Sequence, residues 1–144
     1  MKVCLVQLNP TIGDLQGNTE KLIQAVTENS QADLIIFSEL FLTGYPPGDL
    51  LLRAGFLAEV KEQLARIQRF SRGFPRLGLV FGLPWQERGH LYNSVVVVQN
   101  GEVLGIQPKR KLTTFTLFDE CRYFSVGTEF SLIPFKGQVL GVAV

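Results

Sequence analysis

The sequence predicts an α+β domain in which helices cover one face of a mixed β-sheet. In the first half of the chain, apolar β-type runs alternate with two segments of helical periodicity. In the second half, β-type runs follow one another around Asn100-Gly101, a favoured hairpin turn, and around Lys136-Gly137. Strands that first alternate with helices and then succeed one another favour a mixed sheet with helices packed against it.

The first half is expected to hold two strands and two helices. Residues 2–8 are mostly apolar and are predicted to form a strand covered on both faces. Asn18 is the candidate N-cap of a helix over 19–29, and residues 32–37 are typical of a second, buried strand. A second helix is predicted over 56–70. Helical spacing places apolar residues on one face of each helix: Leu22, Ile23 and Val26 in the first, and Leu57, Val60, Leu64 and Ile67 in the second.

The second half is expected to be mostly strand and loop. Residues 77–84 are predicted to form a third strand, and 92–107 hold two β runs around the Asn-Gly turn. Residues 108–129 lack periodicity and are expected to form a long irregular loop. Residues 130–144 are predicted to form two more strands. Because the last of them reaches Val144 without a turn or a polar tail, the chain is expected to be part of a longer protein.

Composition narrows the classes of function. The 144 residues are 46% hydrophobic and 19% charged, which is typical of a globular domain. The formal net charge is +1 with interspersed signs, so neither nucleic acid nor an anionic membrane surface is expected as a partner. Two cysteines and one histidine are too few for a disulfide framework or a zinc site. No metal is therefore expected, and the cytoplasm is the predicted location.

Glu39 is the first candidate functional residue. It follows the apolar run 32–37 and precedes the large apolar residues 40–42, so its carboxylate is costly to desolvate unless it is paired or used. A surface-loop glutamate, or one paired with an arginine or with backbone N–H groups, would explain the pattern as well. Lys109 follows the fifth predicted strand, and functional groups gather at the carboxyl ends of strands in open αβ sheets. The spacing thus allows these two residues to share a site without requiring it.

The loop that begins at Lys109 carries further charged residues. The run "PKRK" has the alternative of a solvated, charged surface. Asp119, Glu120 and Arg122 could likewise pair with one another in water. Neither pattern by itself separates a functional site from a charged surface.

The stretch 33–52, "DLIIFSELFLTGYPPGDLLL", resembles the carbon–nitrogen hydrolase (nitrilase) superfamily, in which an apolar strand leads into a catalytic glutamate. The part "YPPGDLLL" is similar to the glutaminase domains of the glutamine-dependent NAD synthetase family. "GLVFGLP", "LYNSVVVVQNGEVLG", "KRKL" and "FDECRYF" follow in the family's order and approximate spacing, so the resemblance covers essentially the whole chain. It implies a nitrilase-like αββα sandwich, of which residues 1–144 would be the incomplete N-terminal part of the glutaminase domain.

The resemblance implies an amidase that uses a glutamate, a lysine and a cysteine. Glu39 would be the general base that takes the thiol proton, and Lys109 would stabilise the oxyanion. Glu120, in the element "FDE", matches an acidic position and would position the amide or the lysine, with pairing to Arg122 as the alternative. The family's cysteine follows a "GVAV"-type strand, so the thiol is expected directly after Val144, and residues 1–144 alone are expected to be inactive.

Two aromatic residues are expected in the glutamine pocket by the same resemblance. Phe115 stands where the family commonly has a tyrosine, so it keeps the ring and loses a hydroxyl, whose hydrogen bond is worth about 0.5–1.5 kcal/mol. Phe118 matches the phenylalanine of the family's "VFDE" element, and simple burial in the pocket wall is its alternative role.

The chain's own cysteines are weaker candidates for the nucleophile. Cys4 lies in the first strand and is expected to fill the core. Cys121 occupies a position that is commonly basic in the synthetases. A cysteine–histidine dyad is a further alternative, but His90 has no cysteine near it in the sequence.

The resemblance also implies partners that lie beyond this segment. The domain would hydrolyse L-glutamine and supply ammonia to an ATP-dependent synthetase domain that amidates deamido-NAD. ATP and Mg would bind to that second domain, and no cofactor is expected in residues 1–144, which contain no glycine-rich phosphate loop. A homo-oligomer is expected. The alternatives are a free-standing amidase of the superfamily that acts on another small amide, and a non-catalytic oligomerisation module.

Overall fold

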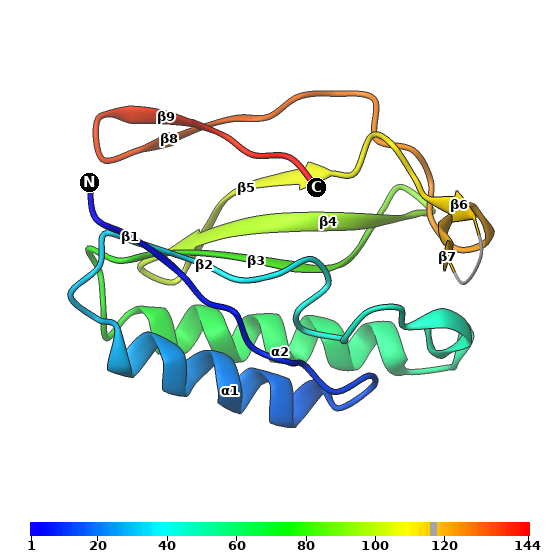
Figure 1. Cartoon of the computed structure of the whole chain (residues 1–144), viewed down its shortest axis with the longest axis horizontal. Helices are drawn as coiled ribbons and strands as arrows, with labels where there is room; N and C mark the ends of the chain where they lie inside the picture. The colour runs from blue at the N-terminus through cyan, green and yellow to red at the C-terminus, as the bar shows by residue number, and fades with distance from the viewer. Residues whose placement is uncertain (116–117) are drawn as a thin grey trace.

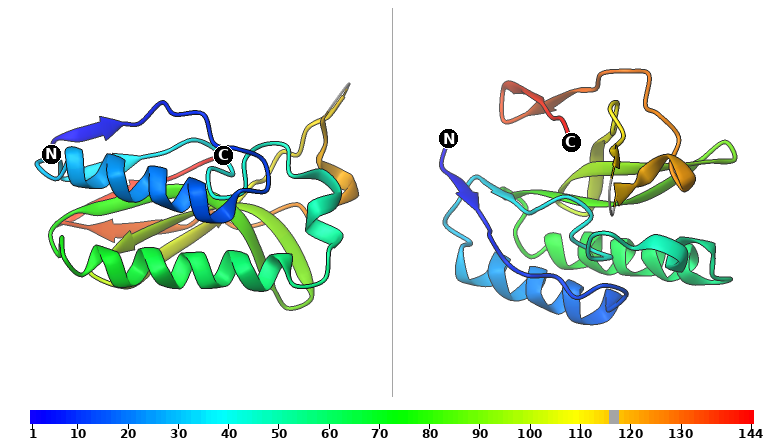
Figure 2. Two further views of the ribbon diagram at one scale, coloured as in Figure 1. Left: turned by 90° about the horizontal axis from the view of Figure 1, so that it is seen from below. Right: turned by 45° about the vertical axis from the view of Figure 1, so that its right-hand side comes forward.

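The computed structural model, which describes residues 1–115 and 118–144, is built in layers (Figure 1). Two helices pack against one face of a central sheet, and a short β-hairpin lies over the opposite face (Figure 2). The predicted α+β class, with helices on one face of a mixed sheet, is confirmed. The outer layers are helices α1 (Leu15–Glu28) and α2 (Phe56–Ser71) on one side and strands β8 (Leu132–Phe135) and β9 (Gln138–Gly141) on the other.

The central sheet has five strands that lie side by side in sequence order. The first three strands are parallel, and the third, fourth and fifth are antiparallel. Tight turns join the antiparallel strands, and each turn contains two residues of positive φ: Arg88-Gly89, and the predicted Asn100-Gly101. The strands are β1 (Val3–Leu5), β2 (Leu34–Ile36), β3 (Gly78–Glu87), β4 (His90–Gln99) and β5 (Glu102–Pro108).

The segment 108–129, expected to be irregular, contains short regular elements. A two-stranded ribbon and a 3₁₀ turn lie in it, and a second 3₁₀ turn follows the Pro46-Pro47 loop. The elements within 108–129 are β6 (Thr114–Phe115), β7 (Phe118–Asp119) and η2 (Glu120–Arg122). The turn after Pro46-Pro47 is η1 (Gly48–Leu52). Residues 116 and 117, which belong to the same expected loop, lie outside the described residues.

Helix α1 begins earlier than the sequence pattern predicts. Asp14 caps it in place of Asn18, because Oδ1 of Asp14 accepts the backbone N–H of Gly17 at 2.9 Å. Asn18 is instead fully buried within the helix, where its side-chain amide donates to the carbonyl oxygens of Thr11 and Leu42. Asn18 therefore ties the helix to the loop after β2, a tertiary role that competes with capping.

An apolar core lies on each face of the sheet. On the helix side, Leu22, Val26 and Ile67 have no exposed surface. On the other side, Val80 and Val97 pack with residues of β8. Successive residues of β3 and β4 alternate between these two cores, as strand geometry requires. The sheet is thus covered on both faces over its central strands.

Strand β1 departs from the prediction of a strand covered on both faces. Cys4 packs against the helix-side core as expected, but the side chains of Val3 and Leu5 are on the other face and are 43% and 76% exposed. The apolar cluster beneath the β8–β9 hairpin takes its described sheet residues from β2 to β5. Within residues 1–115 and 118–144, the second β layer therefore does not extend over this edge of the sheet.

Gly82 of β3 permits the loop after β2 to cross the sheet at close range. A Cβ atom at this position would lie 2.1 Å from the backbone nitrogen of Leu40 and 2.8 Å from the backbone carbonyl carbon of Glu39. The N–H of Leu42 donates to the carbonyl oxygen of Gly82 at 3.1 Å, which holds the crossing in place. The missing side chain at Gly82 thus decides how closely Glu39 approaches the sheet.

We expect the substitution Gly82→Ala to lower the free energy of unfolding by about 1–3 kcal/mol, since the backbone of the crossing loop would have to move. Denaturant unfolding of the two proteins measures the difference. Gly141→Ala is the matched control: no atom lies within 4 Å of a Cβ at Gly141, and its φ is not positive. The control should change stability by less than about 0.5 kcal/mol, and an equally small effect of Gly82→Ala would contradict the close crossing.

An ion pair joins the start of β2 to the turn of the β8–β9 hairpin. Nζ of Lys136 pairs with Oδ1 of Asp33, and Oδ2 of Asp33 accepts the backbone N–H of Lys2 at 2.6 Å. The hydrogen bond from Lys136, supported by the one from Lys2, lowers the pKa of Asp33 to about 2. The pair therefore connects the outer β layer to the sheet wherever Asp33 is ionised.

This pair should make part of the stability depend on pH. Because the folded-state pKa of Asp33 lies below the ordinary value of 3.8, the stabilisation is present above that pH and is lost as the pH falls toward 2. We expect Asp33→Asn to lower the midpoint of thermal unfolding at pH 6 and to have little effect near pH 2. Melting curves of both proteins across this range are the measurement, and a difference that stays constant with pH would count against the ion pair.

Candidate functional site

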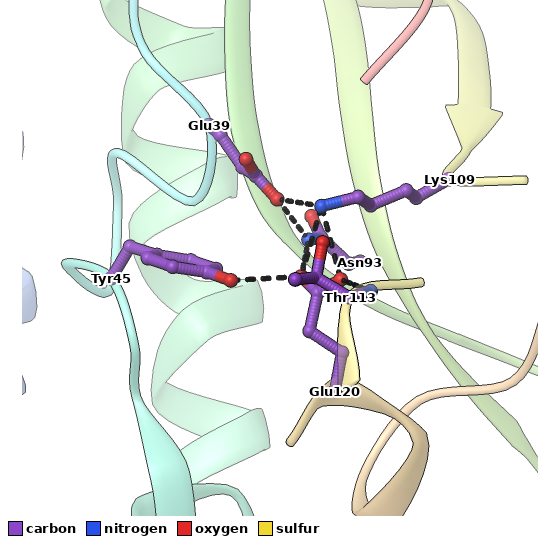
Figure 3. A network of polar contacts seen from close by, with 6 residues as sticks. All are labelled: Glu39, Tyr45, Asn93, Lys109, Thr113 and Glu120. Carbon is purple, nitrogen blue, oxygen red and sulfur yellow. Dashed lines mark hydrogen bonds and ion pairs between the residues drawn. The ribbon is translucent and has the colours of Figure 1, made fainter. Parts of the chain in front are cut away.

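Polar side chains from four segments meet at the carboxyl end of β2 (Figure 3). Glu39 follows β2, Asn93 lies in β4, Lys109 directly follows β5, and Glu120 begins η2. Asn93, Lys109 and Glu120 are only 1%, 7% and 4% exposed, whereas the side chain of Glu39 is 33% exposed. Charges removed from water to this extent must be paired, and the contacts below supply the partners.

The backbone turns sharply directly after Glu39. Leu40 has a φ of 45°, in the left-handed region that residues other than glycine rarely adopt. The N–H of Thr43 closes the turn by donating to the carbonyl oxygen of Leu40 at 3.0 Å. Leu40 and the next two residues are fully buried in the helix-side core, which leaves the Glu39 carboxylate to meet Lys109 on the other face. The strained turn thus separates the carboxylate from its apolar neighbours.

The ammonium group of Lys109 contacts both carboxylates. Its Nζ lies 2.7 Å from Oε1 of Glu39, and 3.1 Å and 3.0 Å from Oε1 and Oε2 of Glu120. Burial alone would lower the pKa of Lys109, but the hydrogen bonds to Glu39 and Glu120 outweigh it and raise the pKa above 10.5. Lys109 is therefore positively charged at neutral pH.

Asn93 donates to the same two carboxylates. Its Nδ2 lies 2.5 Å from Oε1 of Glu39 and 2.9 Å from Oε1 of Glu120. Its backbone carbonyl also accepts the N–H of Lys109 at 2.7 Å. Asn93 thus contacts every charged member of the cluster, through either its side chain or its main chain.

Glu120 receives donors on both carboxylate oxygens. Besides Lys109 and Asn93, the backbone N–H of Thr113 donates to Oε2 at 2.7 Å, and the hydroxyl of Tyr45 donates to Oε1 at 3.3 Å. Burial by itself raises the pKa of Glu120, but the bonds from Thr113, Lys109 and Asn93 overcome it and lower the pKa below 4.5. Burial, together with the two nearby carboxylates, raises the pKa of Tyr45 to about 12. Glu120 is thus a fixed anion, and Tyr45 stays a neutral donor.

The two carboxylates are therefore in unequal environments. Both hydrogen bonds of Glu39 go to Oε1, and its Oε2 makes no hydrogen bond to any described residue (Figure 3). One ammonium and two carboxylates leave the cluster with one net negative charge. Glu39 therefore has the more exposed side chain and one oxygen free of described partners, whereas both oxygens of Glu120 are bonded.

Two small pockets border the cluster. One, of about 170 Å³, is lined by Glu39, by residues of the central strands and by residues 142–144. The other, of about 140 Å³, is lined by Tyr45, Phe118 and Glu120 among others. Glu39 and Glu120 thus each line a pocket of their own.

The structure brings three of the five predicted site residues into direct contact: Glu39, Lys109 and Glu120. Phe118 lines the smaller pocket, and its ring stacks on that of Tyr45 with centroids 5.7 Å apart. Phe115 is 66% exposed, and its ring meets the edge of Phe118 at 6.0 Å without lining that pocket. Its place in the glutamine pocket stays a prediction.

The alternative pairing of Glu120 with Arg122 does not occur. Arg122 pairs with Asp49 at 3.5 Å, on the exposed side of η2. Glu120 points the other way and pairs with Lys109. Glu120 is therefore buried against the lysine, whereas the side chain of Arg122 is exposed.

Asn93 and Tyr45 belong to the cluster but were not predicted as site residues. Both lie in segments that carry the family resemblance, "LYNSVVVV" and "TGYPPGD". The available signal was an asparagine two residues before the valine run of a central strand, where a polar side chain needs a buried partner. Nothing in the local pattern indicates which partner that would be.

The remaining candidates lie apart from the cluster. Cys4 is half-buried, Cys121 is exposed, and neither lines the pockets beside Glu39 and Glu120. His90 is exposed, with Nδ1 at 3.2 Å from the hydroxyl of Ser125. Over residues 1–115 and 118–144, no group of three histidine, cysteine or acidic side chains is placed to hold a metal ion. Neither helix in the same ranges has the length and apolar character needed to span a membrane.

Comparison with known proteins identifies the family of the chain. Residues 2–144 match the family model described as carbon–nitrogen hydrolase. The glutamine-dependent NAD(+) synthetase of Thermotoga maritima is 40% identical over 147 residues, an alignment that covers 100% of this chain and 25% of the relative. The chain thus spans about a quarter of the length of this curated relative.

Solved structures show the same fold. The glutamine-dependent NAD+ synthetase of Acinetobacter baumannii, solved with ADP, has a TM-score of 0.86 and 36% identity and covers 99% of this chain and 27% of its own. An amidase from Nesterenkonia sp. has a TM-score of 0.87 at 23% identity and covers 99% and 54%, a likeness of fold alone. Since the family model spans almost every residue, the chain belongs to the carbon–nitrogen hydrolase family and forms part of a nitrilase-like fold.

Proposed function

We propose that this chain is the N-terminal part of a glutaminase domain, which hydrolyses the side-chain amide of glutamine within a longer glutamine-dependent NAD synthetase. The observation that carries the proposal is the 2.7 Å contact between Oε1 of Glu39 and Nζ of Lys109, residues 70 positions apart. The substrate is inferred from the relatives, which are glutamine-dependent NAD(+) synthetases at up to 40% identity.

Glu39 acts as the general base in this proposal. The nucleophile is the cysteine thiol that the family resemblance places directly after position 144, and residues 142–144 line the same pocket as Glu39. A thiol of ordinary pKa is mostly protonated at neutral pH, so an adjacent base is required. Glu39 takes the thiol proton, and the sulfur attacks the carbonyl carbon of the glutamine amide.

Lys109 stabilises the negative charge that develops on the amide oxygen. Its raised pKa keeps it cationic, and its almost complete burial strengthens its effect on a nearby oxyanion. As the tetrahedral intermediate collapses, the carbon–nitrogen bond breaks and Glu39 returns the proton to the departing ammonia. Water, activated by the same carboxylate, then hydrolyses the thioester to glutamate and regenerates the thiol.

Glu120 and Phe118 have supporting roles. Glu120 holds Lys109 through contacts of 3.0–3.1 Å, in addition to the contact that Lys109 makes with Glu39. Phe118 and Tyr45 form one wall of the adjacent 140 Å³ pocket, which suits the aliphatic part of a small amide. The ammonia would then pass to an ATP- and Mg-dependent domain elsewhere in the longer protein, where it amidates deamido-NAD.

Substituting Glu39 by glutamine in the full-length protein should separate the two activities. The variant keeps the shape of the side chain but cannot accept a proton, so glutamine-dependent NAD formation should fall by at least about 100-fold. Formation driven by added ammonium should persist, since it bypasses this site. Steady-state assays with each nitrogen source provide the measurement.

Glu59→Gln on the exposed face of α2 is the matched control, because it makes the same chemical change away from the cluster. Equal loss of both activities in Glu39→Gln would assign Glu39 a structural role. Amide hydrolysis without any ammonium-dependent synthesis in the unaltered protein would favour a free-standing amidase.

Residues 1–144 alone should not hydrolyse glutamine, since neither of their cysteines lines a pocket beside Glu39 or Glu120. Purified chain of this length, incubated with glutamine, is assayed for glutamate release. Turnover that disappears in a Cys121→Ser variant would instead make Cys121 the nucleophile.

A further inference from the structure

Two nitrogen atoms and two oxygen atoms form a closed ring at the centre of the cluster. Nζ of Lys109 and Nδ2 of Asn93 each contact Oε1 of Glu39 and Oε1 of Glu120, at distances of 2.5–3.1 Å. Within this ring, each of the two oxygens receives one charged donor, from Lys109, and one neutral donor, from Asn93 (Figure 3). The amide of Asn93 is the neutral half of this ring, and no role has so far been assigned to it.

The orientation of the Asn93 amide is set by the charges around it. Turning the amide over would bring Oδ1 against two carboxylate oxygens, which is repulsive. In the observed orientation, Oδ1 is buried and has no hydrogen-bond partner among the described residues. Leaving a buried acceptor unpaired costs free energy, so the two bonds from Nδ2 outweigh that cost.

The lack of charge on Asn93 matters for the proposed base. A second cation at this position would balance both carboxylates and hold Glu39 firmly in its ionised form, which would weaken it as a proton acceptor. An apolar residue would leave Lys109 as the sole side-chain donor to Glu39. An amide occupies a position between these extremes, because it fixes Oε1 of Glu39 and adds no charge.

We propose that Asn93 is the positioning residue of the amide hydrolysis proposed above: its uncharged amide fixes Oε1 of Glu39 and leaves Oε2 as the oxygen that exchanges the proton. This inference rests on the proposed function. Asn93 acts through Glu39 and Lys109 and forms no bond to the reacting atoms. The main-chain carbonyl of Asn93 accepts the N–H of Lys109 at 2.7 Å. This hydrogen bond keeps the side-chain amide of Asn93 next to the lysine.

The test uses full-length protein with Asn93→Leu, which has a similar size and no donor, and Asn93→Asp, which replaces the donor by a third carboxylate. For each variant, kcat and KM for glutamine are measured from pH 5 to 9. The groups that face Asn93 and titrate or carry charge are Glu39, Glu120, Lys109 and, through Glu120, Tyr45. Ammonium-dependent synthesis and the melting temperature report on folding.

We expect Asn93→Leu to lower kcat/KM for glutamine by about 10- to 100-fold, mainly through kcat, because the base is no longer held in place. The acidic limb of the kcat/KM profile should move to higher pH, since the ionised form of Glu39 loses a donor. Asn93→Asp should move this limb further in the same direction, because three carboxylates then surround one ammonium. Ammonium-dependent synthesis should stay near its original rate.

Ser94→Ala is the matched control. Ser94 is the next residue of β4, is fully buried, and its hydroxyl has no partner among the described residues. Its loss should leave the pH profile in place. If Asn93→Leu does not fold, Asn93→Ser, which is smaller and keeps a weaker donor, must show the same limb shift to a lesser degree.

Unchanged pH profiles, with kcat within about threefold of the original, would overturn the inference while leaving the proposed function intact. A fall in melting temperature and in both activities with no shift of the acidic limb would also overturn it, by showing a purely structural role. Failure of the unaltered protein to hydrolyse glutamine would instead refute the proposed function itself.

Discussion

An ammonium group that is almost fully removed from water is stable only when anions replace its hydration, and Glu39 and Glu120 do so for Lys109. Removing either carboxylate would leave the lysine short of a partner, and removing the lysine would bring two carboxylates together unshielded. Because the three residues come from the ends of β2 and β5 and from η2, the same contacts also hold these segments together. The proposed chemistry and the local stability therefore depend on the same contacts.

The shape of the sheet makes this convergence possible. One face of β3 carries Gly78 and Gly82, where a Cβ atom would lie 2.6 Å from the ring of Phe135 and 2.1 Å from the backbone of Leu40. Gly78 leaves room for Phe135 of the outer β layer, and Gly82 leaves room for the loop that carries Glu39. Large side chains on the opposite face of the same strand fill the helix-side core. Strand β3 thus has glycines where other segments approach its backbone and large apolar side chains where it packs against the helices.

The cluster shows how environment assigns different roles to similar groups. Glu120 is buried, has donors on both oxygens and has a lowered pKa, so it remains an anion that holds the lysine. Glu39 is a third exposed and has one oxygen free of described partners, which fits the proposed role of general base. Asn93 makes this division possible without altering the net charge, since it donates to both carboxylates.

Local patterns in the sequence were sufficient for the order of strands and helices and for the Asn100-Gly101 and Lys136-Gly137 turns. Motif resemblance singled out Glu39, Lys109 and Glu120, which the fold brings into contact and whose roles stay predictions. Periodicity and turn chemistry act over a few residues, so they can be deduced from the chain itself. The cap at Asp14, the exposed face of β1 and the part played by Asn93 could not be deduced in this way. Each depends on which distant segment arrives beside the residue: the hydrogen bond from Asn93 to Glu39 joins positions 54 residues apart. Strand register and the close crossing at Gly82 determine which distant residues come into contact. Both are properties of the folded molecule and not of the local sequence.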